Sequence, residues 1–68
     1  AEQFEQWIEE LPERQRETFK LSRYEGLDHE EIAGVMGISG KTVNNHMVAA
    51  LSYLRNCYDT YQREVNED

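Results

Sequence analysis

The apolar residues in the second half of the chain recur at intervals of three and four positions from Val43 to Val65. This spacing places them on one face of a helix. No Gly or Pro follows Gly40, so no helix-breaking residue interrupts the pattern. It therefore predicts one long helix that begins near Gly40 or Lys41. Its periodic residues are Val43, Met47, Ala50, Leu51, Leu54, Tyr58, Tyr61 and Val65.

Two shorter helices are predicted near the N-terminus. The first covers residues 2–11 and ends at the dipeptide Leu11-Pro12. Pro12 suits the first turn of the next helix, which we expect over residues 13–25, with Phe19 in the core and Gly26 beyond its end. The apolar face of the first helix is formed by Phe4, Trp7, Ile8 and Leu11. We expect this face to pack against the distal part of the long helix, around Leu54, Tyr58 and Tyr61.

A third helix is predicted from His29 to Met36. Asp28 and Glu31 have the spacing of a capping box, in which each side chain bonds the backbone of the other residue. Gly37 suits the left-handed residue just past a helix end, and Ser39 offers a hydroxyl to cap the following helix. The residues expected to point inward from the third helix are Ile32, Val35 and Met36.

These elements predict an all-α fold, a small bundle of four helices. A chain of 68 residues is near the lower limit for an independent hydrophobic core, so we expect a single domain over residues 1–68. The connection Gly37-Ile38-Ser39 between the last two helices is typical of a helix-turn-helix, placed at about residues 28–55. Because the chain begins with Ala1 rather than Met, we expect it to be a piece of a longer protein.

The charge of the chain is unevenly distributed. The net charge is −7, which as an average argues against nucleic-acid binding, because DNA affinity depends on Lys and Arg that meet phosphates. However, no Asp or Glu lies between Glu31 and Asp59, a segment that carries Lys41 and Arg55. A polyanion can therefore approach this segment, while the acidic flanks face elsewhere.

The start of the long helix carries residues suited to DNA. In a helix-turn-helix the second helix enters the major groove, and its first turns reach the base edges. Asn can pair with adenine, Lys with guanine, and Val can contact a thymine methyl group. Hydroxyls and free N–H groups at a helix start suit phosphate. The predicted DNA-binding residues are Ser39, Gly40, Lys41, Thr42, Asn44, Asn45, His46 and Val48.

Other classes of site find little support. His46 lies at the edge of the apolar face, where a phosphate contact or a packing role is favoured over metal binding, because its one potential His partner, His29, is on another helix. Adjacent carboxylates such as Glu9-Glu10 and Glu30-Glu31 diverge on a helix surface, so we expect no enzymatic activity, cofactor or metal. The single Cys57 favours a reduced, cytoplasmic setting, and no apolar run is long enough for membrane insertion.

Four runs of the sequence together resemble region 4 of bacterial sigma factors, and the extracytoplasmic-function group most closely. The ordered set LP…R…F…EG…EIA…GIS…TV…A…LR is specific for this family, whereas each piece alone is weak evidence for it. The resemblance covers roughly residues 11–55. The runs are LPERQRETF at 11–19, YEGLDHEEIA at 24–33, MGISGKTVNNHM at 36–47 and ALSYLR at 50–55.

The resemblance implies a domain that binds the −35 element of double-stranded promoter DNA through the long helix. It also implies that an outer surface contacts the beta flap of core RNA polymerase, and that an anti-sigma factor can be a partner. It places Lys41, Asn44, Asn45, His46 and Val48 toward the groove, and Ser39 and Thr42 near the DNA backbone. The family often has Arg where this chain has Asn44, His46 and Ala49, which implies lower phosphate affinity here.

Two other interpretations remain open at the level of sequence. The DNA-binding output domains of two-component and quorum-sensing response regulators share the helix-turn-helix and a similar TV…H stretch. Leu11-Pro12 and the run ALSYLR favour the sigma resemblance over that one. A protein-interaction module without DNA binding would instead use the acidic surface and the stripe formed by Tyr58 and Tyr61.

Overall fold

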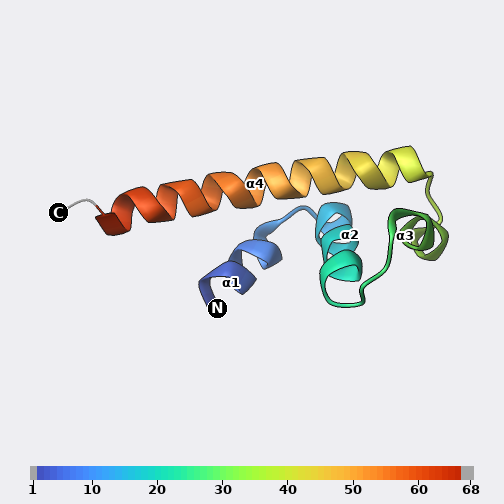
Figure 1. Ribbon diagram of the computed structural model, residues 1–68, viewed down its shortest axis with the longest axis horizontal. Helices are drawn as coiled ribbons and strands as arrows, with labels where there is room; N and C mark the ends of the chain where they lie inside the picture. The colour runs from blue at the N-terminus through green and yellow to red at the C-terminus, as the bar shows by residue number, and fades with distance from the viewer. Residues whose placement is uncertain (1, 67–68) are drawn as a thin grey trace.

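The computed structural model describes residues 2–66, and this part of the chain folds into four α-helices. They are α1 (Glu2–Glu10), α2 (Glu13–Arg23), α3 (His29–Met36) and α4 (Gly40–Asn66). Figure 1 shows α4 as one straight rod along the molecule, with α1, α2 and α3 arranged in order along one side of it. The predicted all-α, four-helix fold with a helix-turn-helix is therefore confirmed.

A first hydrophobic cluster joins α1, α2 and the middle of α4. Its buried residues are Trp7, Ile8, Leu11, Phe19, Ala50 and Leu54, with Phe4, Met47 and Cys57 packed against them. The rings of Trp7 and Tyr61 meet edge-on with their centroids 5.8 Å apart, a favourable geometry for aromatic pairs. The expected packing of the first helix against the distal part of α4 is therefore confirmed, although Tyr58 and Tyr61 remain 54% and 43% exposed.

A second, smaller cluster joins α3 to the beginning of α4. Its buried residues are Ile32, Met36 and Val43, surrounded by Leu21, Leu27, Ala33, Ile38 and Met47. Met47 thus packs against both clusters. The prediction that Val35 points inward was wrong, because this side chain is 62% exposed. Ile32 and Met36 lie one turn apart and fill the narrow strip of α3 that meets its neighbours, while Val35 lies beyond the edge of that strip.

The boundaries of α2 differ slightly from those predicted. Pro12 lies just before the helix in an extended conformation, with ψ of 148°, and its carbonyl accepts a bond from the Arg16 N–H at 2.8 Å. The helix ends at Arg23 rather than at Glu25. Gly26 adopts a left-handed φ of 70°, a conformation that glycine reaches without steric cost. The chain therefore leaves the helix before this turn.

Polar contacts fix α1 against α2. The Arg16 guanidinium donates to the carbonyls of Glu9 and Leu11, each at 3.1 Å, and so satisfies carbonyl groups left without partners where α1 ends. The Lys20 ammonium pairs with the Glu9 carboxylate at 2.5 Å. The hydrogen bond from Lys20 lowers the pKa of the Glu9 carboxyl, and the positive charges of Lys20 and Arg16 act in the same direction.

A hydrogen bond between side chains connects α1 to α4, and it moves the ionisation of one tyrosine to higher pH. The Tyr53 hydroxyl donates to the Glu10 carboxylate at 2.8 Å. This bond is the main cause that raises the pKa of the Tyr53 phenol from 10.0 to about 12, and the neighbouring Cys57 side chain adds to the effect. Because the folded state raises the pKa, the bond stabilises the fold fully below pH 10.0 and loses its effect as the pH rises through about 12.

We therefore expect Glu10→Gln to lower the pKa of the Tyr53 phenol toward 10.0, because the glutamine amide can donate to a phenolate and carries no charge. The measurement is an alkaline titration followed by tyrosinate absorbance, in which Tyr53→Phe identifies the late component. Glu9→Gln, which removes the neighbouring carboxylate bound by Lys20, is the matched control and should leave that component in place. An unchanged late component in Glu10→Gln would contradict the assignment.

Candidate nucleic-acid interface

The turn between α3 and α4 is built from local backbone and side-chain bonds. The capping box predicted at the start of α3 is confirmed, since the Glu31 N–H donates to Asp28 at 2.8 Å and the Asp28 N–H donates to Glu31 at 2.9 Å. At the other end, Gly37 takes the left-handed conformation, with φ of 69°. The N–H of Ile38 then bonds the Ala33 carbonyl at 3.1 Å, as in glycine-terminated helices.

Ser39 begins α4 in the predicted way. Its hydroxyl oxygen accepts a bond from the Thr42 N–H at 3.1 Å and lies 2.9 Å from the Thr42 hydroxyl. The Val43 N–H bonds the Ser39 carbonyl at 3.0 Å, which closes the first turn of α4. The two hydroxyls and the first N–H groups of the helix, beginning at Gly40, therefore lie together at the end of the rod, with the positive end of the helix dipole.

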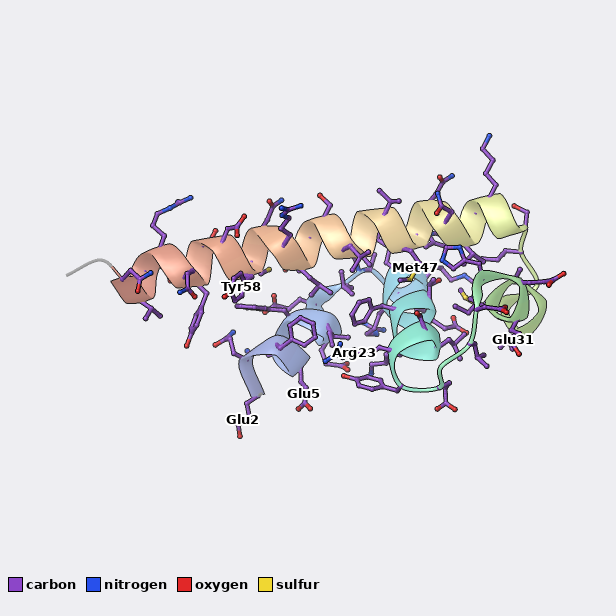
Figure 2. All side chains as sticks on the ribbon, viewed as in Figure 1. Glu2, Glu5, Arg23, Glu31, Met47 and Tyr58 are labelled. Atoms are coloured by element: carbon purple, nitrogen blue, oxygen red, sulfur yellow. The ribbon has the colours of Figure 1, made fainter. Side chains whose placement is uncertain are left out.

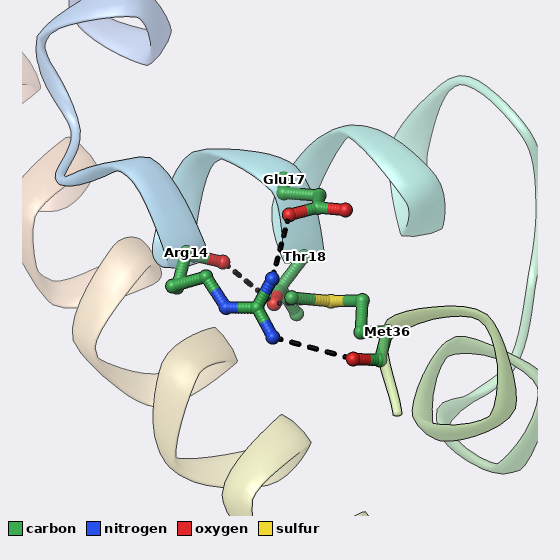
Figure 3. Close-up of polar contacts among 4 residues, drawn as sticks. All are labelled: Arg14, Glu17, Thr18 and Met36. Atoms are coloured by element: carbon green, nitrogen blue, oxygen red, sulfur yellow. Dashed lines mark hydrogen bonds and ion pairs between the residues drawn. The ribbon is translucent and has the colours of Figure 1, made fainter. Parts of the chain in front are cut away.

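Arg14 ties α2 to the end of α3, as Figure 3 shows. Its guanidinium donates to the Met36 carbonyl at 3.3 Å and pairs with the Glu17 carboxylate at 3.2 Å. The Met36 carbonyl is one of the groups at a helix end that have no partner within the helix. Fully buried Thr18 donates to the Arg14 carbonyl at 2.8 Å, and the same oxygen lies 3.2 Å from the Met36 sulfur. These contacts hold the last turn of α3, and hence the turn into α4, against α2.

The first turns of α4 separate a buried face from a polar one. Val43 and Ala50 are fully buried, and Met47 lies half-buried between them. The side chains on the other face are exposed, and these are Lys41, Asn44, Asn45 and Val48. The prediction from periodicity of which side of α4 is buried and which is exposed is therefore confirmed.

The remaining predicted contact residues are placed differently. Ser39 and Gly40 are exposed at the helix start, whereas Thr42 and His46 are half-buried on the flank of α4. His46 thus has partial access to solvent, as expected for a residue at the edge of the apolar face. No group of three or more His, Cys, Asp or Glu that would hold a metal ion occurs within residues 2–66.

The polar face carries no acidic side chain. The acids nearest to it in the sequence are Glu31 in the first turn of α3 and Asp59 in the distal half of α4. A polyanion such as DNA can therefore approach the first turns of α4 without meeting a carboxylate on that face. Within the described part of the chain, no helix combines the length and the apolar character needed to cross a bilayer.

The sequence did not reveal that Arg14 supports the end of α3. This residue belongs to the run at 11–19 that carried the resemblance, but a polar side chain on a helix gives no periodic signal that identifies its partner. Its acceptor is a backbone carbonyl 22 positions away in the sequence, and only the packed structure brings the two together. Arg14 is therefore a residue that supports the turn rather than one of the exposed polar face.

Comparison with known proteins agrees with this arrangement. No curated protein and no solved structure matches the chain. Residues 1–54, which include α1, α2, α3 and the first half of α4, match the protein family described as "Sigma-70, region 4". The match covers well over half of the chain and contains α3, the turn and the first half of α4. The chain therefore belongs to the sigma-70 region 4 family.

Proposed function

We propose that this domain reads the −35 element of promoter DNA as region 4 of a sigma factor of the extracytoplasmic-function group. The observation that carries the proposal is the exposed, acid-free polar face at the start of α4, which directly follows the helix-turn-helix turn. In this geometry Asn44 or Asn45 reads adenine, Lys41 bonds guanine or phosphate, and Val48 contacts a thymine methyl group. Ser39, Gly40, Thr42 and His46 approach the DNA backbone.

The low positive charge of the interface determines how the domain works. Only Lys41 and Arg55 bring formal positive charge to the acid-free segment, so the isolated domain binds DNA weakly. A tether to a larger assembly raises the effective concentration of a weak site to the millimolar range for a short linker. We therefore propose that the domain acts in the cytoplasm as a non-catalytic part of the RNA polymerase holoenzyme. In that setting the beta flap holds it near the promoter and an anti-sigma factor competes for it.

The test has two steps. A preferred duplex is first selected from random double-stranded DNA, and the affinity of the domain for that duplex is then measured as a function of salt concentration. Neutralising Z phosphates gives a slope near −0.9Z in a plot of log K against log salt, so contacts to one to three phosphates predict a slope between about −1 and −3. The expected result is selection of one unpaired site with this shallow slope. Selection of two paired half-sites would favour a dimeric response regulator instead. Nanomolar binding with a slope steeper than about −5 would contradict the proposed interface.

A further inference from the structure

One side chain at the edge of the polar face of α4 can gain a positive charge near neutral pH. Histidine is the residue type whose charge changes between about pH 5 and 8, and the chain has two histidines. His46 is half-buried on the flank of α4, within the acid-free segment. His29 is exposed at the start of α3, directly before Glu30 and Glu31. Of the two, His46 is the one that adds charge beside the polar face.

The ring of His46 is available to a ligand. Within residues 2–66, neither of the two ion pairs and none of the side-chain hydrogen bonds involves this ring. His46 follows Thr42 by four positions, so the two side chains lie one turn apart on the same side of the helix. Thr42 is half-buried like His46, and its hydroxyl lies 2.9 Å from that of Ser39. These polar groups therefore form one edge of the polar face.

The charged groups that α1 and α2 bring to this part of the molecule balance one another. They are Arg14, Arg16 and Glu17 of α2 and Glu10 of α1. Arg14 pairs with Glu17 at 3.2 Å, and Arg16 donates to the Leu11 carbonyl at 3.1 Å. The Glu10 carboxylate accepts from Tyr53, which lies two turns from His46 along α4. No net charge on these two helices therefore competes with a polyanion for a protonated ring.

The third helix packs against the start of α4 without bringing charge to it. Its residues in contact with Val43 are the apolar Ile32 and Met36. Its acidic side chains are in the first turn, at the opposite end of that helix from the turn into α4. Figure 2 shows Glu31 on α3 apart from Met47, the residue that follows His46 on α4.

We infer that DNA binding by this domain is coupled to protonation of His46. The inference rests on the proposed function. The protonated ring contacts a backbone phosphate, so the complex binds one proton more than the free domain, and the affinity for DNA rises as the pH falls. Lys41 and Arg55 are the two formal positive charges of the acid-free segment, so a third cation is a large relative change. One more neutralised phosphate makes the salt slope steeper by about 0.9, which at about 0.1 M salt corresponds to an affinity up to about eightfold higher.

The experiment measures the affinity of the domain for its selected duplex over a range of salt, at about pH 6 and at about pH 8. We expect affinity at the lower pH to be higher by about three- to eightfold, with a slope steeper by about 0.9. His46→Gln should keep the weaker binding at both pH values. His46→Arg, which carries a permanent charge, should bind tightly at both. His29→Gln is the matched control and should keep the pH dependence, because it changes the average charge of the domain equally but lies away from the polar face.

Several outcomes would overturn the inference. They are equal affinity of the original domain at both pH values, a pH dependence that persists in His46→Gln, and a pH dependence that His29→Gln abolishes. Loss of binding in His46→Arg as well as in His46→Gln would show that the ring serves packing, and it would overturn the inference too. A selected duplex bound independently of pH leaves the proposed function standing. Failure to select any duplex at either pH would overturn both.

Discussion

Replacing Trp7 by alanine is expected to unfold the domain under conditions in which the original chain is folded. Trp7 is 8% exposed and belongs to the first cluster, with its ring edge-on to Phe4 at 6.4 Å and to Tyr61 at 5.8 Å. Truncating a buried Trp to Ala costs about 3–5 kcal/mol. A domain of 68 residues has few other buried contacts to offset such a loss, so most of its stability would disappear.

The measurement is urea unfolding followed by far-ultraviolet circular dichroism, which does not depend on the Trp signal. Val35→Ala is the matched control, because Val35 is 62% exposed on α3 and its truncation should change the free energy of unfolding by less than about 0.5 kcal/mol. If Trp7→Ala retained the urea midpoint of the original chain, α1 would not be part of the folding unit, and its apolar face would have to serve another surface.

The second large effect concerns base recognition by α4. Under the proposed function, alanine at whichever of Asn44 or Asn45 pairs with adenine should reduce discrimination at one base pair by about 1–3 kcal/mol, or roughly 5- to 150-fold. Both side chains are exposed on the polar face of the helix, so the substitution should leave stability nearly unchanged. Lys41→Ala should instead weaken binding to all sequences alike if its ammonium contacts phosphate.

Selection from randomised duplexes measures the base preference at each position. Asn56→Ala provides the control, since Asn56 is an exposed asparagine of the same helix well beyond the face proposed to enter the groove. Its selected sequence should equal that of the original chain. If both Asn44→Ala and Asn45→Ala also kept the original preference at every base pair, these two residues would have no part in reading DNA.

Much of the fold follows from signals between residues close together in the sequence. The capping box of Asp28 and Glu31, the left-handed Gly37 and the Ser39 cap each involve neighbours within three or four positions. They define where α3 begins and ends and where α4 begins. The 27 residues of α4 supply enough turns for the apolar period to identify the buried face at Val43 and Ala50. The helix ends were predictable because local backbone chemistry determines them, and the buried face because the apolar period of a long helix marks it.

The parts that sequence reasoning missed depend on which elements meet in space. α3 has only eight residues, so its periodicity is compatible with Ile32, Val35 and Met36 on one face, and packing leaves Val35 outside. The contact of Arg14 with the Met36 carbonyl has no local signal. For the candidate interface, the exposure of Asn44 and Asn45 followed from helical phase. Which base pair each residue meets depends on how the whole domain is seated on the duplex by its backbone contacts, which the phase of one helix does not determine.

The shared position of Met47 between the two clusters has a consequence for the dynamics of the molecule. The cluster around Ile32 is the smaller one, and besides the backbone of α4 and the Arg14 contacts, Met47 is the side chain that packs against both halves. Regions with fewer buried contacts open at lower free energy than the rest of a fold. We therefore expect α3 and the turn to open as one unit at a lower free energy than the first cluster around Trp7. A ligand at the start of α4 would stabilise this unit most, because a ligand that binds only the closed state stabilises it by RT ln(1 + [L]/Kd).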